Sequence, residues 1–105
     1  MGVRQARAVM NGAVSEKEFQ QTVVQYAQLR GWRTYHTYDS RRSASGFPDL
    51  TLVRGTQLVF AELKREGGRP TEDQQTWLDA LGAVIGVDAY LWFPSDWPTI
   101  EDVLR

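Results

Sequence analysis

The chain has 105 residues, of which 42% are hydrophobic and 24% are charged, a length and composition typical of one folded domain. It contains no cysteine and a single histidine, which excludes disulfides, thiol catalysis and most cysteine or histidine metal sites. No apolar run is long enough to span a membrane and no signal-peptide pattern opens the chain, so we expect a cytoplasmic protein.

The charges are distributed unevenly, although the formal net charge is only −1 at pH 7. Residues 1–70 contain 11 Lys or Arg and 6 Asp or Glu, whereas residues 71–105 contain one Arg and seven Asp or Glu. This asymmetry suits a face that binds a polyanion such as nucleic acid. Ordinary solvated surface charge is the alternative interpretation.

An N-terminal arm precedes the first predicted helix. Residues 1–14 show no regular apolar pattern, so we expect an arm there and a domain over residues 15–105. The helix begins with a capping-box pattern, in which Ser15 is the N-cap and Glu18 the third helical residue, and it extends to Arg30. Its predicted apolar face consists of Phe19, Val23, Val24, Tyr26, Ala27 and Leu29.

A strand and a polar loop follow this helix. Residues 32–38 contain aromatic residues and threonines in alternation, which predicts a strand, and His36 within it receives no role from its pattern alone. The loop over residues 39–46 contains hydroxyl and guanidinium donors of the kind that bind phosphate oxygens. An ordinary solvated loop has the same composition. The donors of interest are Arg41, Arg42, Ser43 and Ser45.

A β-hairpin is predicted next, because two apolar runs at residues 50–53 and 58–63 flank a short turn, Arg54-Gly55-Thr56-Gln57. Antiparallel pairing brings Asp49, which precedes the first strand, beside Glu62 near the end of the second. Side chains alternate between faces along a strand, so Glu62 and Lys64 share a face.

Two carboxylates and an ammonium group are therefore expected at one end of the sheet. Two carboxylates at one site repel each other, and a divalent cation such as Mg²⁺ removes that repulsion. The alternative is structural: Glu62 and Lys64 would form a solvated pair at the edge of the sheet, with Asp49 in a turn after Pro48.

The last third of the chain begins with a basic, glycine-containing turn that includes Arg65 and Arg69. A second capping box, with Thr71 as N-cap and Gln74 as third residue, predicts a helix that ends near Gly86. The apolar face of this helix is predicted to contain Trp77, Leu78, Leu81, Val84 and Ile85.

A final strand and helix complete the pattern. Residues 89–93 are apolar and aromatic, and a right-handed crossover would place this strand parallel to the second hairpin strand. After a turn at residues 94–98, a short helix is expected over residues 99–104. The resulting order (helix, three strands, helix, strand, helix) predicts an α/β fold with a mixed central sheet flanked by helices.

Several of these segments together resemble the stand-alone VRR-NUC domains of bacteria and phages, which belong to the PD-(D/E)XK nuclease superfamily. Pro48-Asp49 followed by Glu62-Leu63-Lys64 is similar to the core motif of that superfamily. The resemblance spans residues 15–97 and implies a restriction-endonuclease-like αβββαβ core. The hairpin and first helix are also similar to archaeal-type Holliday junction resolvases. The accompanying segments are Ser15-Glu16-Lys17-Glu18-Phe19-Gln20, Gly31-Trp32, Gly46-Phe47-Pro48-Asp49-Leu50, Phe60-Ala61-Glu62-Leu63-Lys64, and Gln74 with Trp77-Leu78.

The resemblance also implies roles for individual residues. Asp49 and Glu62 would bind Mg²⁺ or Mn²⁺ together with the backbone carbonyl of Leu63, and Lys64 would orient and help deprotonate the attacking water. Glu16 would complete the ligand set or hold a water beside it, whereas its local sequence is explained by the helix dipole alone. Gln74 would lie beside the lysine. The residues expected to position the DNA backbone are Arg41, Arg42, Ser43, Ser45, Arg65 and Arg69.

These features predict a metal-dependent, structure-selective DNA endonuclease of a bacterial or phage-infected cell, with the four-way Holliday junction as substrate. A flap, nick or duplex endonuclease and a non-catalytic DNA-binding module are the alternatives. Junction resolution needs two active sites, so we expect a homodimer, with apolar surface from Trp92, Phe93 and Trp97. These aromatic residues would otherwise close the core of the monomer.

Overall fold

A computed structural model describes residues 14–38 and 43–105. Residues 1–13 of the predicted arm (residues 1–14), and Arg41 and Arg42 of the polar loop, lie outside the described residues. Val14, the last residue of that arm, is buried in the core. The order of elements within the described ranges is the predicted one. These elements are α2 (Glu16–Leu29), β1 (Arg33–His36), β2 (Leu50–Arg54), β3 (Gln57–Leu63), α3 (Glu72–Gly82), β4 (Val87–Trp92), the 3-10 turn η2 (Pro94–Asp96) and α4 (Trp97–Leu104).

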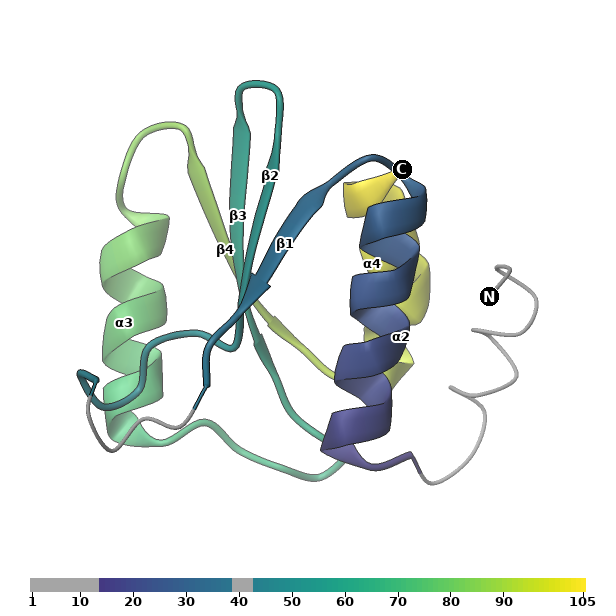
Figure 1. Cartoon of the computed structure of the whole chain (residues 1–105). Coiled ribbons are helices and arrows are strands. Elements are labelled where there is room, and N and C mark those ends of the chain that lie inside the picture. Colours follow the sequence, from purple (N-terminus) through teal and green to yellow (C-terminus); the bar gives the residue numbers. More distant parts are fainter. Residues whose placement is uncertain (1–13, 39–42) are drawn as a thin grey trace.

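The four strands form one mixed sheet in the order β1-β2-β3-β4. β2 pairs antiparallel with both β1 and β3, whereas β4 pairs parallel with β3, as the crossover through α3 predicts. Helix α3 covers one face of the sheet, and α2 and α4 lie together on the other (Figure 1). The predicted α/β architecture is therefore confirmed.

Helix α2 begins where its capping pattern predicts. The Ser15 hydroxyl accepts a 3.1 Å hydrogen bond from the Glu18 N–H and donates one of 3.1 Å to the Glu18 carboxylate. Arg30 caps the other end, and Gly31 follows with φ +88°, a conformation that favours glycine. Leu29, which the pattern places on the apolar face, is exposed.

The main core lies between the sheet and helices α2 and α4. It includes Trp92 and Trp97, each only 2% exposed, and the Trp97 ring contacts Tyr26 edge-on at 5.4 Å. The prediction that Trp92 and Trp97 provide surface for a dimer is therefore wrong. Trp92 ends β4 and Trp97 begins α4, two residues earlier than predicted, so both side chains belong to elements that pack around this core. Phe93, which follows Trp92, is half-buried.

Helix α3 ends earlier than its sequence pattern predicts. Its last helical residue is Gly82, and Ala83 caps it. Val84 is exposed and Ile85 is 100% exposed, so their predicted place on the apolar face of the helix is wrong. The chain has to turn there to enter β4, and the Val87 N–H closes that turn on the Val84 carbonyl at 3.1 Å.

The hairpin end of the sheet is held by Arg54. Its guanidinium donates to the carbonyl of Arg30 at 2.9 Å and to that of Leu104 at 3.2 Å, and it stacks over the Trp32 ring at 4.5 Å. These contacts neutralise the carbonyl ends of α2 and α4 together. No helix within residues 14–38 and 43–105 is long and apolar enough to cross a membrane.

Candidate active site

The predicted cluster lies at the end of the sheet opposite the hairpin turn, where β2 begins and β3 ends. The β2–β3 register pairs Leu50 with Ala61, so Asp49 and Glu62 are the next opposed residues. Helices α2 and α3 both begin at this end of the sheet (Figure 1). The main-chain N–H groups of the two N-termini can bind an anion such as a phosphate, although each first turn also carries acidic side chains, Glu16 and Glu18 in α2 and Glu72 and Asp73 in α3.

Asp49 is held in place by two neighbouring strands. Its Oδ2 accepts a 2.8 Å hydrogen bond from the Leu63 N–H, and its own carbonyl accepts one of 2.8 Å from the Thr37 N–H. The Thr37 hydroxyl also donates to the Pro48 carbonyl at 2.7 Å. Thr37 is the residue that sequence reasoning missed here. The feature that could have identified Thr37 is its place in the strand register, one residue beyond the paired residues His36 and Leu50.

Glu62 is an almost fully buried carboxyl group, only 1% exposed. Burial, followed by a hydrogen bond with the Asp49 side chain and the negative charge of Asp49, raises the pKa of Glu62 from 4.5 to about 9. Without a bound cation, this environment favours the protonated form of the Glu62 carboxyl group, and ionising both acids together would be unfavourable. The Oε1 atom of Glu62 has no hydrogen-bond partner among the described residues.

This arrangement suits a hard divalent cation. An unpartnered buried oxygen is costly, and a cation bound by it would relieve that cost together with the repulsion between the two carboxylates. Leu63 adds a main-chain carbonyl, because the N–H and C=O of one residue in a strand point to the same neighbouring strand. Its N–H already faces Asp49. Oxygen ligands of this kind fit Mg²⁺ or Mn²⁺.

The protein would supply only a few of the ligands of such a cation. In the part of the chain that the structure describes, no three His, Cys, Asp or Glu side chains are grouped so that they could hold a metal ion. Asp49, Glu62 and the Leu63 carbonyl would therefore leave several positions for water or for substrate oxygens. Mg²⁺ in particular keeps several waters and binds through few carboxylates.

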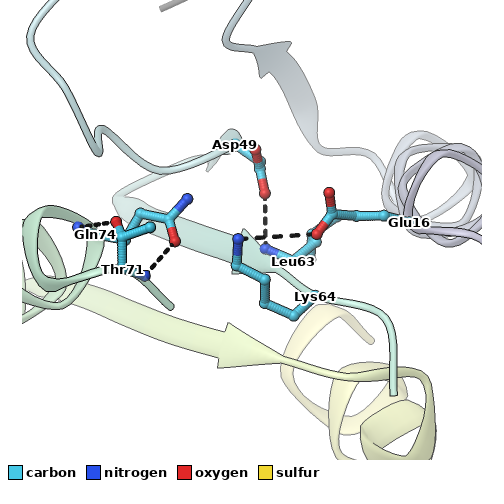
Figure 2. Close-up of polar contacts among 6 residues, drawn as sticks. All are labelled: Glu16, Asp49, Leu63, Lys64, Thr71 and Gln74. Atoms are coloured by element: carbon cyan, nitrogen blue, oxygen red, sulfur yellow. Dashed lines mark hydrogen bonds and ion pairs between the residues drawn. The ribbon is translucent and has the colours of Figure 1, made fainter. Parts of the chain in front are cut away.

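Lys64 and Glu16 meet at the border of the cluster. The Lys64 Nζ lies 4.0 Å from Glu16 Oε1, and the two side chains are 15% and 51% exposed. Figure 2 shows both side chains directed toward each other, with Glu16 reaching in from the start of α2. The structure thus places Glu16 beside the lysine, in a long ion pair that water partly screens.

Gln74 combines a structural role with a place at the site. Its Oε1 accepts from the Thr71 N–H at 2.8 Å and its own N–H donates to the Thr71 hydroxyl at 3.2 Å, so the predicted capping box is confirmed. The amide nitrogen of Gln74 points away from Thr71, toward the side on which Asp49 and Lys64 lie (Figure 2). It remains available to donate a hydrogen bond.

Gly46 brings α3 against the loop that leads to Asp49. Its φ is +89°, and a Cβ atom at this position would lie 2.5 Å from the main-chain carbon of Asp73 and 2.7 Å from the nitrogen of Gln74. Only glycine permits this approach without strain. The close contact fixes the first turn of α3, with Gln74, beside the strand that carries Asp49.

The residues predicted to contact the DNA backbone lie on loops around the cluster. Arg65 and Arg69 are exposed on the connection from β3 to α3, directly after Lys64. Ser43 and Ser45 are exposed on the loop before Gly46. These four positions border the same end of the sheet as the carboxyl pair, so a polyanion bound there would pass near them.

Comparisons with known proteins agree with this geometry. The model of the VRR-NUC domain family matches residues 4–91. A solved structure described as a VRR_NUC domain protein superposes with a TM-score of 0.68 at 19% sequence identity, over 88% of this chain and 86% of that one. At this identity the likeness concerns the fold. A search of curated proteins gave no match.

Proposed function

The chain belongs to the VRR-NUC domain family, a family of nuclease domains, and from this premise we propose that it is a metal-dependent endonuclease that hydrolyses DNA phosphodiester bonds. The observation that carries the proposal is Glu62, a buried carboxyl beside Asp49 whose Oε1 has no partner among the described residues. Structural stabilisation does not explain such a pair, because burying two acids together is unfavourable.

The carboxyl pair and the Leu63 carbonyl would hold the cation. When bound, Mg²⁺ or Mn²⁺ would add positive charge beside the scissile phosphate and favour ionisation of water there. Lys64 then serves the attacking water: its ammonium, which lies 4.0 Å from Glu16, would stabilise negative charge that develops on the water oxygen. The Gln74 amide and the start of α3 can donate to a phosphate oxygen.

Arg65 and Arg69, with Arg41, Arg42, Ser43 and Ser45, are proposed to hold the phosphate backbone on either side of the cluster. Contacts of this type position DNA without reading its sequence. Selectivity would then come from the shape of the DNA, which leads to branched DNA as the proposed class of substrate.

Two kinds of branched substrate make different demands on the protein. Resolving a four-way junction needs two symmetric cuts, hence a homodimer with two clusters at a fixed distance. Of the three residues expected to provide apolar surface for that dimer, Trp92 and Trp97 are buried in the monomer core and Phe93 is half-buried. A single cut at a flap or nick needs one cluster, so the structure gives more support to that activity, with junction resolution as the second candidate.

One set of measurements tests these assignments. End-labelled junction, flap, nicked and linear duplex DNA would be incubated with the protein in Mg²⁺, Mn²⁺ or EDTA, while light scattering gives the mass of the free and DNA-bound protein. We expect cation-dependent cutting of branched or nicked DNA, abolished in Glu62→Gln. Symmetric cutting by a dimer would favour the junction, cutting by a monomer would favour the flap or nick, and no cation-dependent cutting would contradict the proposal.

A further inference from the structure

A cavity lies between α2 and the edge strand β1, outside the carboxyl cluster. Its volume is about 460 Å³, within the range of small-molecule sites in proteins. Neither the proposed catalytic residues nor the predicted DNA-backbone contacts use it. The residues that line it are Lys17, Gln20, Gln21, Val24, Gln25 and His36.

The chemistry of this lining suits a nucleotide. Each glutamine amide offers both a donor and an acceptor, as the edges of nucleobases do, and none of the described residues that line the cavity carries a carboxylate that would repel a phosphate. Lys17 supplies one positive charge for a phosphate oxygen. Val24 and the aliphatic stems of the glutamines provide an apolar wall for the face of a base.

An aromatic pair borders the cavity on the side of the sheet. The His36 ring packs against the Tyr38 ring at a centroid distance of 4.2 Å, and the Tyr38 side chain is exposed. Rings presented in this way are the usual platforms on which unpaired bases stack, with little preference for sequence. Among the described strands, β1 stands at the edge of the sheet, so this border lies at a side of the sheet that pairs with no further described strand.

The cavity and the carboxyl cluster lie at the same end of the sheet but on opposite faces of it. His36 pairs with Leu50, so its side chain shares the face of Leu50, whereas the next residue, Asp49, points to the other face. The start of α2 links the two, because Lys17 of the cavity directly follows Glu16, the residue that contacts Lys64. A DNA strand with one phosphate at the carboxyl cluster could therefore pass around the start of α2 and bring a nearby nucleotide to the mouth of the cavity.

We propose that this cavity binds an unpaired nucleotide close to the scissile phosphate, a specificity that rests on the proposed nuclease function. A base within a duplex is stacked and paired, so it cannot enter a side pocket unless that pairing is broken. DNA that already has an unpaired nucleotide beside the cut avoids this cost. The cavity would thus select flaps, gaps and branch points over continuous duplex.

Abasic DNA tests this assignment separately from catalysis. A flap oligonucleotide is prepared with a single tetrahydrofuran residue, which lacks a base, at each position around the mapped cut in turn. Binding is measured by fluorescence anisotropy in EDTA, so that no cutting occurs. The variants are Gln20→Ala, Gln25→Ala and His36→Ala, with circular dichroism to verify folding. Gln28→Ala is the matched control, because it lies on the same helix but outside the cavity.

We expect the native protein to lose affinity about tenfold when one particular base is missing, the size typical of a stacked base. The cavity variants should bind intact DNA about tenfold more weakly and lose little more on that abasic DNA, whereas Gln28→Ala should behave like the native protein. The proposal would be overturned if, at every abasic position, the affinity loss of the cavity variants multiplied with the loss caused by the missing base. It would also be overturned if the native protein bound every abasic DNA as tightly as intact DNA.

The same DNA distinguishes failure of the cavity from failure of the nuclease assignment. A native protein that cuts in Mg²⁺ but ignores every missing base overturns the cavity alone. A native protein that binds one abasic DNA more weakly yet cuts no DNA would support the cavity as a nucleotide site. It would overturn the nuclease assignment, and with it the placement of the cavity relative to a cut.

Discussion

The side-chain carboxylate of Asp49 accepts a 2.8 Å hydrogen bond from the main-chain N–H of Leu63. This bond joins the start of β2 to the end of β3 at the point where the sheet would otherwise fray. It also places the Leu63 carbonyl on the side of Asp49, while Glu62, the residue opposite Asp49 in the register, is buried. The same bond therefore completes the pairing of the hairpin and orders the proposed ligands.

Neutralising either carboxyl should abolish cutting. Asp49→Asn and Glu62→Gln keep the size of the side chains but remove the charge that would hold the cation, so we expect cleavage to fall by about two orders of magnitude or more. DNA binding in EDTA should change little. Asp88→Asn, at an exposed position on β4, is the control. Normal cleavage by either site variant would refute the assignment.

Lys64→Met should separate catalysis from binding of the cation. We expect the cleavage rate to fall by about 100-fold while calorimetry shows Mn²⁺ still bound, because the ammonium acts on the water and not on the cation. Glu16→Gln should have a milder, severalfold effect, since its contact with Lys64 is long and half exposed. If Lys64→Met lost Mn²⁺ affinity as completely as Asp49→Asn, this division of roles would be wrong.

The stability of the metal-free protein should depend on pH through Glu62. Its pKa is raised to about 9 in the folded state, so the folded protein binds a proton that the unfolded chain releases above its ordinary value of 4.5. The free energy of unfolding therefore decreases as pH rises from about 4.5 to about 9. Glu62→Gln cannot ionise, so this variant should be more stable than the native protein near pH 8 and should lose that advantage near pH 5.

Urea unfolding of both proteins in EDTA at several pH values measures this difference. Added Mg²⁺ should raise the Tm of the native protein more near pH 8 than near pH 6, because the cation replaces a proton that is already less firmly held. Added Mg²⁺ should leave the Tm of Glu62→Gln unchanged. A constant difference between the two proteins across the whole pH range would show that Glu62 is ionised in the folded protein.

The basic loop should control the salt dependence of DNA binding. Arg65→Ala and Arg69→Ala should each weaken binding to all sequences alike, and should reduce the slope of log K against log salt by about 0.9 for each phosphate that the variant no longer neutralises. Arg41→Ala and Arg42→Ala are expected to act in the same way. Arg105→Ala is the matched control, since Arg105 pairs with Asp102 at the end of α4. Unchanged slopes in the loop variants would place the DNA elsewhere.

Gly46→Ala should damage both stability and activity. The added methyl would meet the backbone of Asp73 at 2.5 Å, and φ of +89° is unfavourable for alanine, so we expect a decrease of about 1–3 kcal/mol in the free energy of unfolding. The shifted start of α3 should also lower the cleavage rate. Gly55→Ala, with φ +60° but open space around it, is the control and should cost stability without affecting cleavage.

Much of the fold follows from patterns that span a few residues. The two helix starts at Ser15 and Thr71 depend on hydrogen bonds within one turn, and the hairpin depends on two apolar runs around a short turn. The parallel last strand follows from the handedness of a strand-helix-strand connection. When the hairpin is predicted with this turn, its register places Asp49 opposite Glu62. The proximity of the two carboxyl groups could therefore be predicted from the sequence.

Only the tertiary structure decided how far each of these groups is buried and what it contacts. The sequence pattern alone does not show that Glu62 is almost fully buried, that Glu16 contacts Lys64, or that Trp92 and Trp97 belong to the monomer core. A side chain's exposure and pKa are set by helices and strands that are distant in sequence but packed together in space. Local patterns therefore determine which residues meet on a strand, whereas long-range packing determines whether water reaches them, and with it their charge.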